Sequence, residues 1–234
     1  MAVHISKQFD ADLEDVRTRV LQMGGLVEDQ IVKAIEGLAT GDLALIEQVI
    51  ADDHRVNALE VELDETCSRV IAKRQPAASD LRLLIAVIKT ITDLERIGDE
   101  AEKIARMAKL VHTAGTVDMP RLELKHVANL ALGMLRKALD TFARLDSKAA
   151  AQVVQQDRLV DDEFRSILRQ LITFMMEDPR TITRSLEILF VAKALERIGD
   201  HSKNMAEYVV YMVEGRDVRH IRADAPPAKD PLAG

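Results

Sequence analysis

The chain has 234 residues, enough for one or two domains with an interior core, and its 47% hydrophobic and 30% charged residues are typical of a globular protein in water. Aromatic residues make up only 3%, and this composition favours helix over sheet. The net charge of -7 argues against a nucleic-acid partner, because binding to phosphate backbones depends on concentrated Lys and Arg.

The single cysteine excludes an intramolecular disulfide and a Cys-rich metal site, and we expect Cys67 to lie in the core. No segment approaches the roughly 20 apolar residues of a membrane-spanning helix. Met1 to Asp10 contains no apolar stretch that could serve as a secretion signal. We therefore expect a protein of the reducing cytoplasm, without a transmembrane segment.

Apolar residues recur at steps of three and four along most of the chain, which is the pattern of amphipathic helices. The first stripe begins near Asp10 or Asp12 and continues in phase across Gly24 and Gly25. The pattern predicts six helices, over about residues 10–40, 43–74, 81–110, 122–145, 150–177 and 181–214.

Turn-forming residues separate these helices. Gly41 is suited to end the first helix, and Asp42 can cap the second. Ser79 or Asp80 is expected as the N-cap of the third helix. Residues 112–120 are predicted to form the only substantial internal linker, and the segment after Gly215 lacks an apolar period.

The sequence Leu-Glu-Arg-Ile-Gly-Asp occurs twice, at 94–99 and at 195–200. The two halves match further, because Asp53 to Asn57 corresponds to Asp157 to Asp161 in the helix before each motif. The sequence therefore predicts an all-α fold of six helices arranged as two tandem antiparallel three-helix bundles. The first repeat is predicted at 1–113 and the second at 114–215, followed by a disordered tail at 216–234.

Each motif places two carboxylates one helical turn apart, Glu95 with Asp99 and Glu196 with Asp200. These acids continue a line that begins as plainly apolar, so we expect them to be buried or semi-buried. Buried carboxylates need a proton, a cation or a metal ion, because uncompensated burial costs several kcal/mol.

Other residues of the motif helices support or limit that reading. A glycine inside a helix costs roughly 1 kcal/mol relative to Ala, so Gly98 and Gly199 indicate a close approach, first by a neighbouring helix and second by a ligand. Arg96 and Arg197 are expected to point away from the acids. His201 is expected to be exposed rather than a ligand.

Paired acids on several helices supply hard oxygen ligands, suited to Mg²⁺, Mn²⁺, Ca²⁺ or iron. Further acids and one amide on the neighbouring helices can complete such a shell. The candidate ligands are Glu95, Asp99, Glu196 and Asp200, then Asp53, Asn57, Glu60, Glu102, Asp157 and Asp161. The alternative is a set of surface ion pairs, for example Asp99 with Lys103.

No phosphate-binding loop or nucleophile elbow is present in the sequence, so we expect no enzyme. Two other interpretations stay open. One is a carboxylate-bridged metalloenzyme of the helical-bundle type, and the other is a purely structural helical scaffold.

The chain resembles the PhoU family over about residues 5–215. The two acidic motif helices carry the resemblance, together with the loop from Pro76 to Arg82 and the stretch from Asp200 to Glu207. The resemblance implies two tandem three-helix bundles, multinuclear iron or zinc at the acidic motifs in some members, and frequent homodimers. Glu95, Asp99, Glu196 and Asp200 carry over as metal-ligand candidates.

The resemblance also implies a role. PhoU proteins restrain phosphate uptake and repress the phosphate-starvation response, through contact with the ATPase of the phosphate ABC transporter and with the phosphate sensor kinase. Association with the membrane would then be peripheral, through those partners. The two copies differ, because Glu100 and Lys103 stand where the second copy has His201 and Asn204. The two sites need not hold the same ion.

Overall fold

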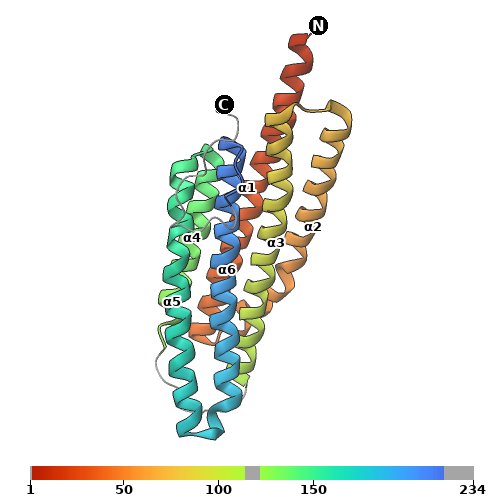
Figure 1. Cartoon of the computed structure of the whole chain (residues 1–234). Coiled ribbons are helices and arrows are strands. Elements are labelled where there is room, and N and C mark those ends of the chain that lie inside the picture. Colours follow the sequence, from red (N-terminus) through yellow and green to blue (C-terminus); the bar gives the residue numbers. More distant parts are fainter. Residues whose placement is uncertain (1, 114–121, 219–234) are drawn as a thin grey trace, which may run out of the picture.

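The protein is described by a computed structural model covering residues 2–113 and 122–218, with side chains from residue 9 onward, and the described residues contain helices and no strand (Figure 1). The elements are α1 (Ala2–Thr40), α2 (Leu43–Arg74), α3 (Ala78–Thr113), α4 (Leu124–Arg144), α5 (Ser147–Glu177), the 3₁₀ helix η1 (Pro179–Thr181) and α6 (Ile182–Glu214). The predicted all-α fold with six α-helices is confirmed.

The helices form two groups of three that pack on each other. Helices α5, α6, α3 and α2 run side by side in that order, while α1 packs on α2 and α3, and α4 packs on α5 and α6 (Figure 1). The two groups meet mainly between the motif helices α3 and α6, and also between α1 and α4. The acidic motifs of both repeats therefore lie near the centre of the molecule.

The apolar stripes form the core. Val20, Met23 and Val27 of α1 are fully buried, as are Ile97 of α3 and Ile198 of α6. Complete burial of one such side chain contributes roughly 1.5–3 kcal/mol. Cys67 is also fully buried, as the sequence predicts. Along the described parts of the chain, no helix combines the length and apolar character that crossing a membrane requires.

The predicted caps between α1 and α2 are confirmed. Gly41 has a φ of 74°, and Asp42 accepts hydrogen bonds from the backbone N–H groups of Ala44 and Leu45. In the second repeat, Asp146 caps α5 in the same way. Asp42 and Asp146 are therefore equivalent positions, and residues of α1 and α2 can be matched with residues of α4 and α5 by counting from these two caps.

Several predicted boundaries differ from the structure. Helix α1 begins at Ala2 rather than near Asp10, because no Gly or Pro interrupts the intervening residues. Helix α3 begins at Ala78, so the prediction of Ser79 or Asp80 as N-cap is wrong. Asp80 instead lies in the first turn, where a negative charge interacts favourably with the helix dipole. The predicted linker begins too early, because residues 112–113 belong to α3; the rest of it and most of the predicted tail lie outside the described residues.

Gly24 has a packing reason to be in α1. A Cβ atom at this position would lie 2.5 Å from Cδ2 of Leu139 in α4, whereas one at Gly25 would meet nothing within 4 Å. The glycine therefore lets the two repeats approach closely where α1 crosses α4.

Candidate metal centre

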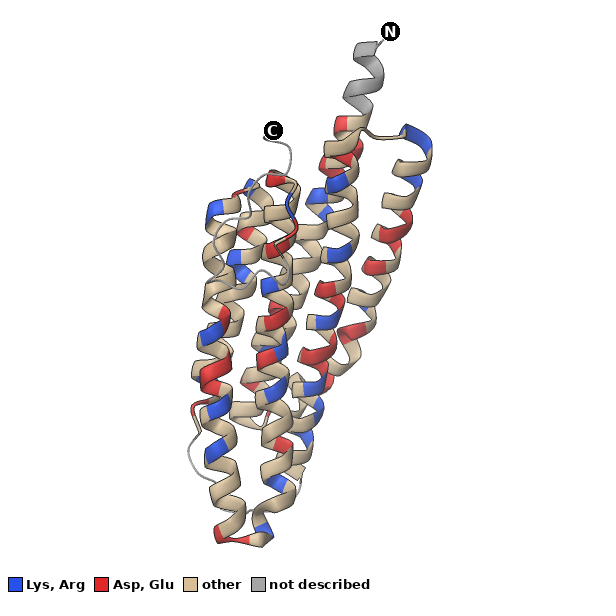
Figure 2. Ribbon diagram, in the orientation of Figure 1, with Lys and Arg blue, Asp and Glu red and all other residues tan. Residues whose placement is uncertain are grey.

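The structure brings the acids of α2 and α3 together in what we call the first cluster. Its members are Asp53, Asn57 and Glu60 of α2, and Glu95, Asp99 and Glu102 of α3. Acidic residues follow one another along both helices in Figure 2. Burial raises the pKa of Asp53, and the negative charges of Glu102 and Asp99 raise it further. Repulsion of this kind acts only between neighbouring groups.

The motif acids of the first cluster are partly buried. The side chain of Glu95 is 19% exposed and that of Asp99 is 39% exposed. Burial raises the pKa of Glu95, and the charge of Asp99 adds to this effect. The pKa of Asp99 is likewise raised, by burial first, although Arg96 opposes the shift. Glu95 and Asp99 are thus partly buried, as the continuing apolar stripe predicts.

Three oxygen atoms on α1 and α2 are buried without a hydrogen-bond donor: Oε1 of Gln30, Oδ1 of Asp53 and Oδ1 of Asn57. The amide of Asn57 donates to the other oxygen of Asp53, at 3.0 Å. A Cβ on Gly98 would lie 3.4 Å from Oε1 of Gln30 and 3.7 Å from Oδ1 of Asp53. These are ordinary van der Waals distances, so a side chain at Gly98 would fit and the packing does not require the close approach predicted there. Acceptor oxygens are nevertheless among the nearest neighbours of Gly98.

Gln30 is a polar residue that the sequence reasoning missed. It is only 5% exposed, and it lies on α1 facing the first cluster. The available signal was a glutamine three residues after Val27 and four before Ala34, inside an otherwise apolar stripe.

The second cluster consists of Asp157 and Asp161 of α5 with Glu196 and Asp200 of α6. Burial raises the pKa of Asp200 to about 6, and the charges of Glu196, Asp157 and Asp161 contribute to the shift. Gly199, unlike Gly98, allows a close approach of the neighbouring helix, because its Cβ would lie 3.3 Å from Cγ1 of Val160 in α5.

Lysines enter the second cluster. Nζ of Lys203 lies 2.7 Å from Oδ2 of Asp157, and Nζ of Lys193 lies 2.6 Å from both carboxylate oxygens of Glu196. Burial works to lower the pKa of Lys203, but the hydrogen bond and the charge of Asp157 outweigh it, so the pKa is raised. The second cluster thus already contains cationic groups.

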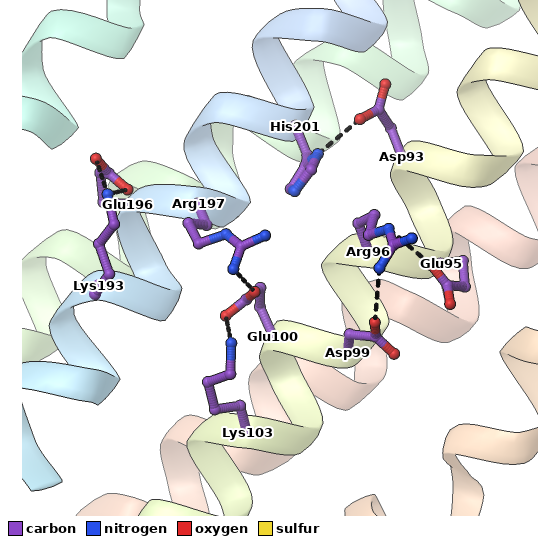
Figure 3. Close-up of polar contacts among 10 residues, drawn as sticks. All are labelled: Asp93, Glu95, Arg96, Asp99, Glu100, Lys103, Lys193, Glu196, Arg197 and His201. Atoms are coloured by element: carbon purple, nitrogen blue, oxygen red, sulfur yellow. Dashed lines mark hydrogen bonds and ion pairs between the residues drawn. The ribbon is translucent and has the colours of Figure 1, made fainter.

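A polar contact joins the two motif helices between the clusters (Figure 3). Nδ1 of His201 lies 2.6 Å from Oδ1 of the buried Asp93, and the amide of Asn204 donates to the same oxygen. The prediction of an exposed His201 is wrong, because 16% of its side chain is accessible and its ring packs against α3.

The buried Glu100 forms a second contact there. Arg197 of α6 lies 2.9 Å from Oε1 of Glu100, and Lys103 donates to the other oxygen at 2.7 Å. The suggested pairing of Lys103 with Asp99 is therefore replaced by one with Glu100. Arg96, the counterpart of Arg197, makes only longer contacts, the nearest at 3.5 Å from Glu95.

The residues of the first cluster suit a cation, because they are hard oxygen donors and three of the nearby oxygens have no donor. Within the described residues, no three His, Cys, Asp or Glu side chains converge closely enough to hold a metal ion as they stand. Binding would thus require side-chain rotation, and metal ligation by either cluster stays a prediction.

Comparison with known proteins gives a consistent result. The model of the PhoU domain matches residues 20–108 and 124–209. A phosphate-specific transport system accessory protein PhoU homolog of Pseudomonas aeruginosa is 50% identical over 218 residues, covering 93% of this chain and 90% of that protein. The Escherichia coli K12 protein PhoU is 47% identical over 222 residues, covering 94% and 91%.

Solved structures agree with this result. The crystal structure of PhoU from Pseudomonas aeruginosa matches with a TM-score of 0.85 at 48% identity, covering 89% of this chain and 100% of that one. The phosphate transport system regulatory protein PhoU from Streptococcus pneumoniae matches with a TM-score of 0.83 at 30% identity, covering 90% and 99%. The duplicated acidic helices, the two three-helix groups and these matches lead to one conclusion: the chain belongs to the PhoU family.

Proposed function

We propose that this protein is a cytoplasmic regulator that restrains phosphate uptake and represses the phosphate-starvation response. The observation that supports this most directly is family membership over both repeats, with relatives named as accessory proteins of phosphate-specific transport. In this role the protein acts as an adaptor between the ATPase of the phosphate ABC transporter and the phosphate sensor kinase, and it catalyses no reaction.

Capture experiments test the adaptor role. Tagged protein from cells grown at high phosphate should retain the transporter ATPase and the sensor kinase, with the amounts changing when cells are shifted to low phosphate. A strain lacking the protein should express its phosphate-starvation genes at high phosphate. Normal repression in that strain, or capture of neither partner under both conditions, would rule out the proposal.

We further propose that the adaptor binds metal, with iron or zinc as the first candidates and Mg²⁺ or Mn²⁺ as alternatives. Glu95 and Asp99 would hold it in the first cluster, and Glu196 and Asp200 in the second. A bound metal supplies positive charge that offsets the repulsion among these partly buried carboxylates. Each cluster draws acids from two helices, α2 and α3 in the first repeat and α5 and α6 in the second, so a metal ion that neutralises them would stiffen both repeats.

Elemental analysis of the purified protein tests the metal proposal. The native protein should contain bound metal, and replacing both Glu95 and Glu196 by Ala should remove most of it. Full metal content in the double variant would contradict the assignment of these ligands. Light scattering on the same samples tests the proposed homodimer, and a phosphatase and oxidase screen with added metals should show no turnover.

A further inference from the structure

We infer that the two acidic clusters are unequal towards a metal ion. The first takes it up with Gln30 as an additional neutral oxygen ligand, whereas the second already holds a cation of its own, Lys203, that a metal ion must displace. This inference rests on the metal binding of the proposed function and adds the order in which the two clusters take up metal ions.

Gln30 is built into the first cluster from a third helix. Its side chain is almost fully buried in α1, and its amide oxygen has no donor. This oxygen and Oδ1 of Asp53 both lie against the open side of Gly98. A buried acceptor without a donor has lost its bonds to water, and a cation restores what is missing. The three unpaired oxygens thus mark a place for positive charge.

The arginines near the first cluster leave Asp53 without a direct cationic partner. Arg106 pairs with Glu102 and is 56% exposed, so it sits at the rim. Arg96 is 3.7 Å from Asp99 and is also half exposed. Neither arginine reaches the unpaired oxygens of Asp53 and Gln30.

The corresponding positions of the second repeat carry different chemistry. Met134 stands 12 residues before the cap Asp146, where Gln30 stands 12 before Asp42. Lys203 stands four residues after Gly199, where Glu102 follows Gly98 by four. One neutral ligand and one acid of the first cluster are therefore replaced by a thioether and a cation. Met134 is buried among apolar residues and gives no oxygen.

Lys203 fills the role of a cation in the second cluster. It bonds Asp157 directly, and its charge also acts on the pKa of Asp200 and Asp161. Among the described residues, the acids of this cluster have no buried oxygen without a partner. A metal ion entering here gains less electrostatic energy, because it must compete with an ammonium group already in place.

Calorimetric titration of the metal-free, full-length protein with Mn²⁺, followed in parallel by electron paramagnetic resonance, tests the inference. The first equivalent should bind at least about tenfold more tightly than the second. Gln30→Met, which introduces the residue of the second repeat, should weaken only the first step, by about tenfold. Lys203→Met should strengthen only the second step, by about tenfold.

Matched variants separate ligand loss from unfolding. Gln30→Glu keeps an oxygen at the same place and should retain tight binding in the first step. Lys125→Met removes an exposed lysine of α4 and should change neither step. Two equal sites, or unchanged affinities in both Gln30→Met and Lys203→Met, would overturn the inference while leaving the metal proposal intact. No Mn²⁺, iron or zinc binding by any variant would overturn both.

Discussion

The two motif helices share six consecutive residues, among them Arg197 and its copy Arg96, yet they differ at the other positions where they meet each other. Asp93 and Glu100 of α3 face His201, Asn204 and Arg197 of α6. The copy of Asp93 in α6 is Ala194, and the copy of Glu100 is His201. Two identical helices packed together would have placed like charges in a buried contact, at a cost of several kcal/mol. Divergence of the flanking residues turned that repulsion into attraction.

The two acidic clusters show the opposite relation. Their motif acids are the same, and the residues around those acids differ, on the motif helices as well as on their neighbours. The shared motif therefore defines the positions of the carboxylates. Gln30 in the first cluster and Lys203 in the second decide how much additional positive charge each cluster can accept.

Replacing the two equivalent arginines of the motif helices should destabilise the protein by unequal amounts. Arg197→Met leaves the buried Glu100 with Lys103 alone, and we expect a loss of about 2–3 kcal/mol in the free energy of unfolding, below the full cost of a broken buried pair. Arg96→Met changes the equivalent residue of the other copy and should cost less than about 0.5 kcal/mol, because Arg96 is half exposed.

Urea unfolding of both variants measures this difference. Adding Glu100→Gln to Arg197→Met should recover part of the lost stability, since the uncompensated charge is removed. Equal losses in the two arginine variants would show that the contact between the motif helices does not distinguish the copies.

A second comparison concerns neighbouring glycines where α1 crosses α4. Gly24→Ala should destabilise the protein by about 1–2 kcal/mol, because overpacking against Leu139 outweighs the gain in helix propensity. Gly25→Ala meets open space and should stabilise it by up to about 1 kcal/mol. Thermal unfolding of the pair checks the sign, and stabilisation by both would mean that Leu139 moves aside freely.

A further expected effect is a pH dependence in the metal-free protein. The pKa of Asp200 is about 6 in the folded state against an ordinary value of 3.8, so the folded state binds more protons between these values. The resulting stabilisation is fully present below about pH 3.8 and is lost as the pH rises through about 6. Melting temperatures between pH 5 and 7 should fall less steeply in Asp200→Asn than in the native protein. An unchanged slope would contradict the raised pKa.

Much of the fold could be predicted because it depends on local pattern. The apolar period gave six helices, and the cap at Asp42 was correct. The errors lie at helix ends, as at Ala2 and Ala78, where termination depends on weak differences in propensity. Similarly, Glu95 and Asp99 were predicted to lean inward from their place on the stripe, and their partial burial agrees.

The sequence by itself determined the duplicated unit, the six helices and the placement of each pair of motif acids on one helical face, because these follow from spacing along the chain. Only the tertiary structure decided that His201 meets Asp93, that Gln30 reaches Gly98 and that Lys203 neutralises Asp157. Those contacts join residues tens to over a hundred positions apart, and no local period encodes which helix faces which. The physical character of each cluster is therefore set by packing between helices.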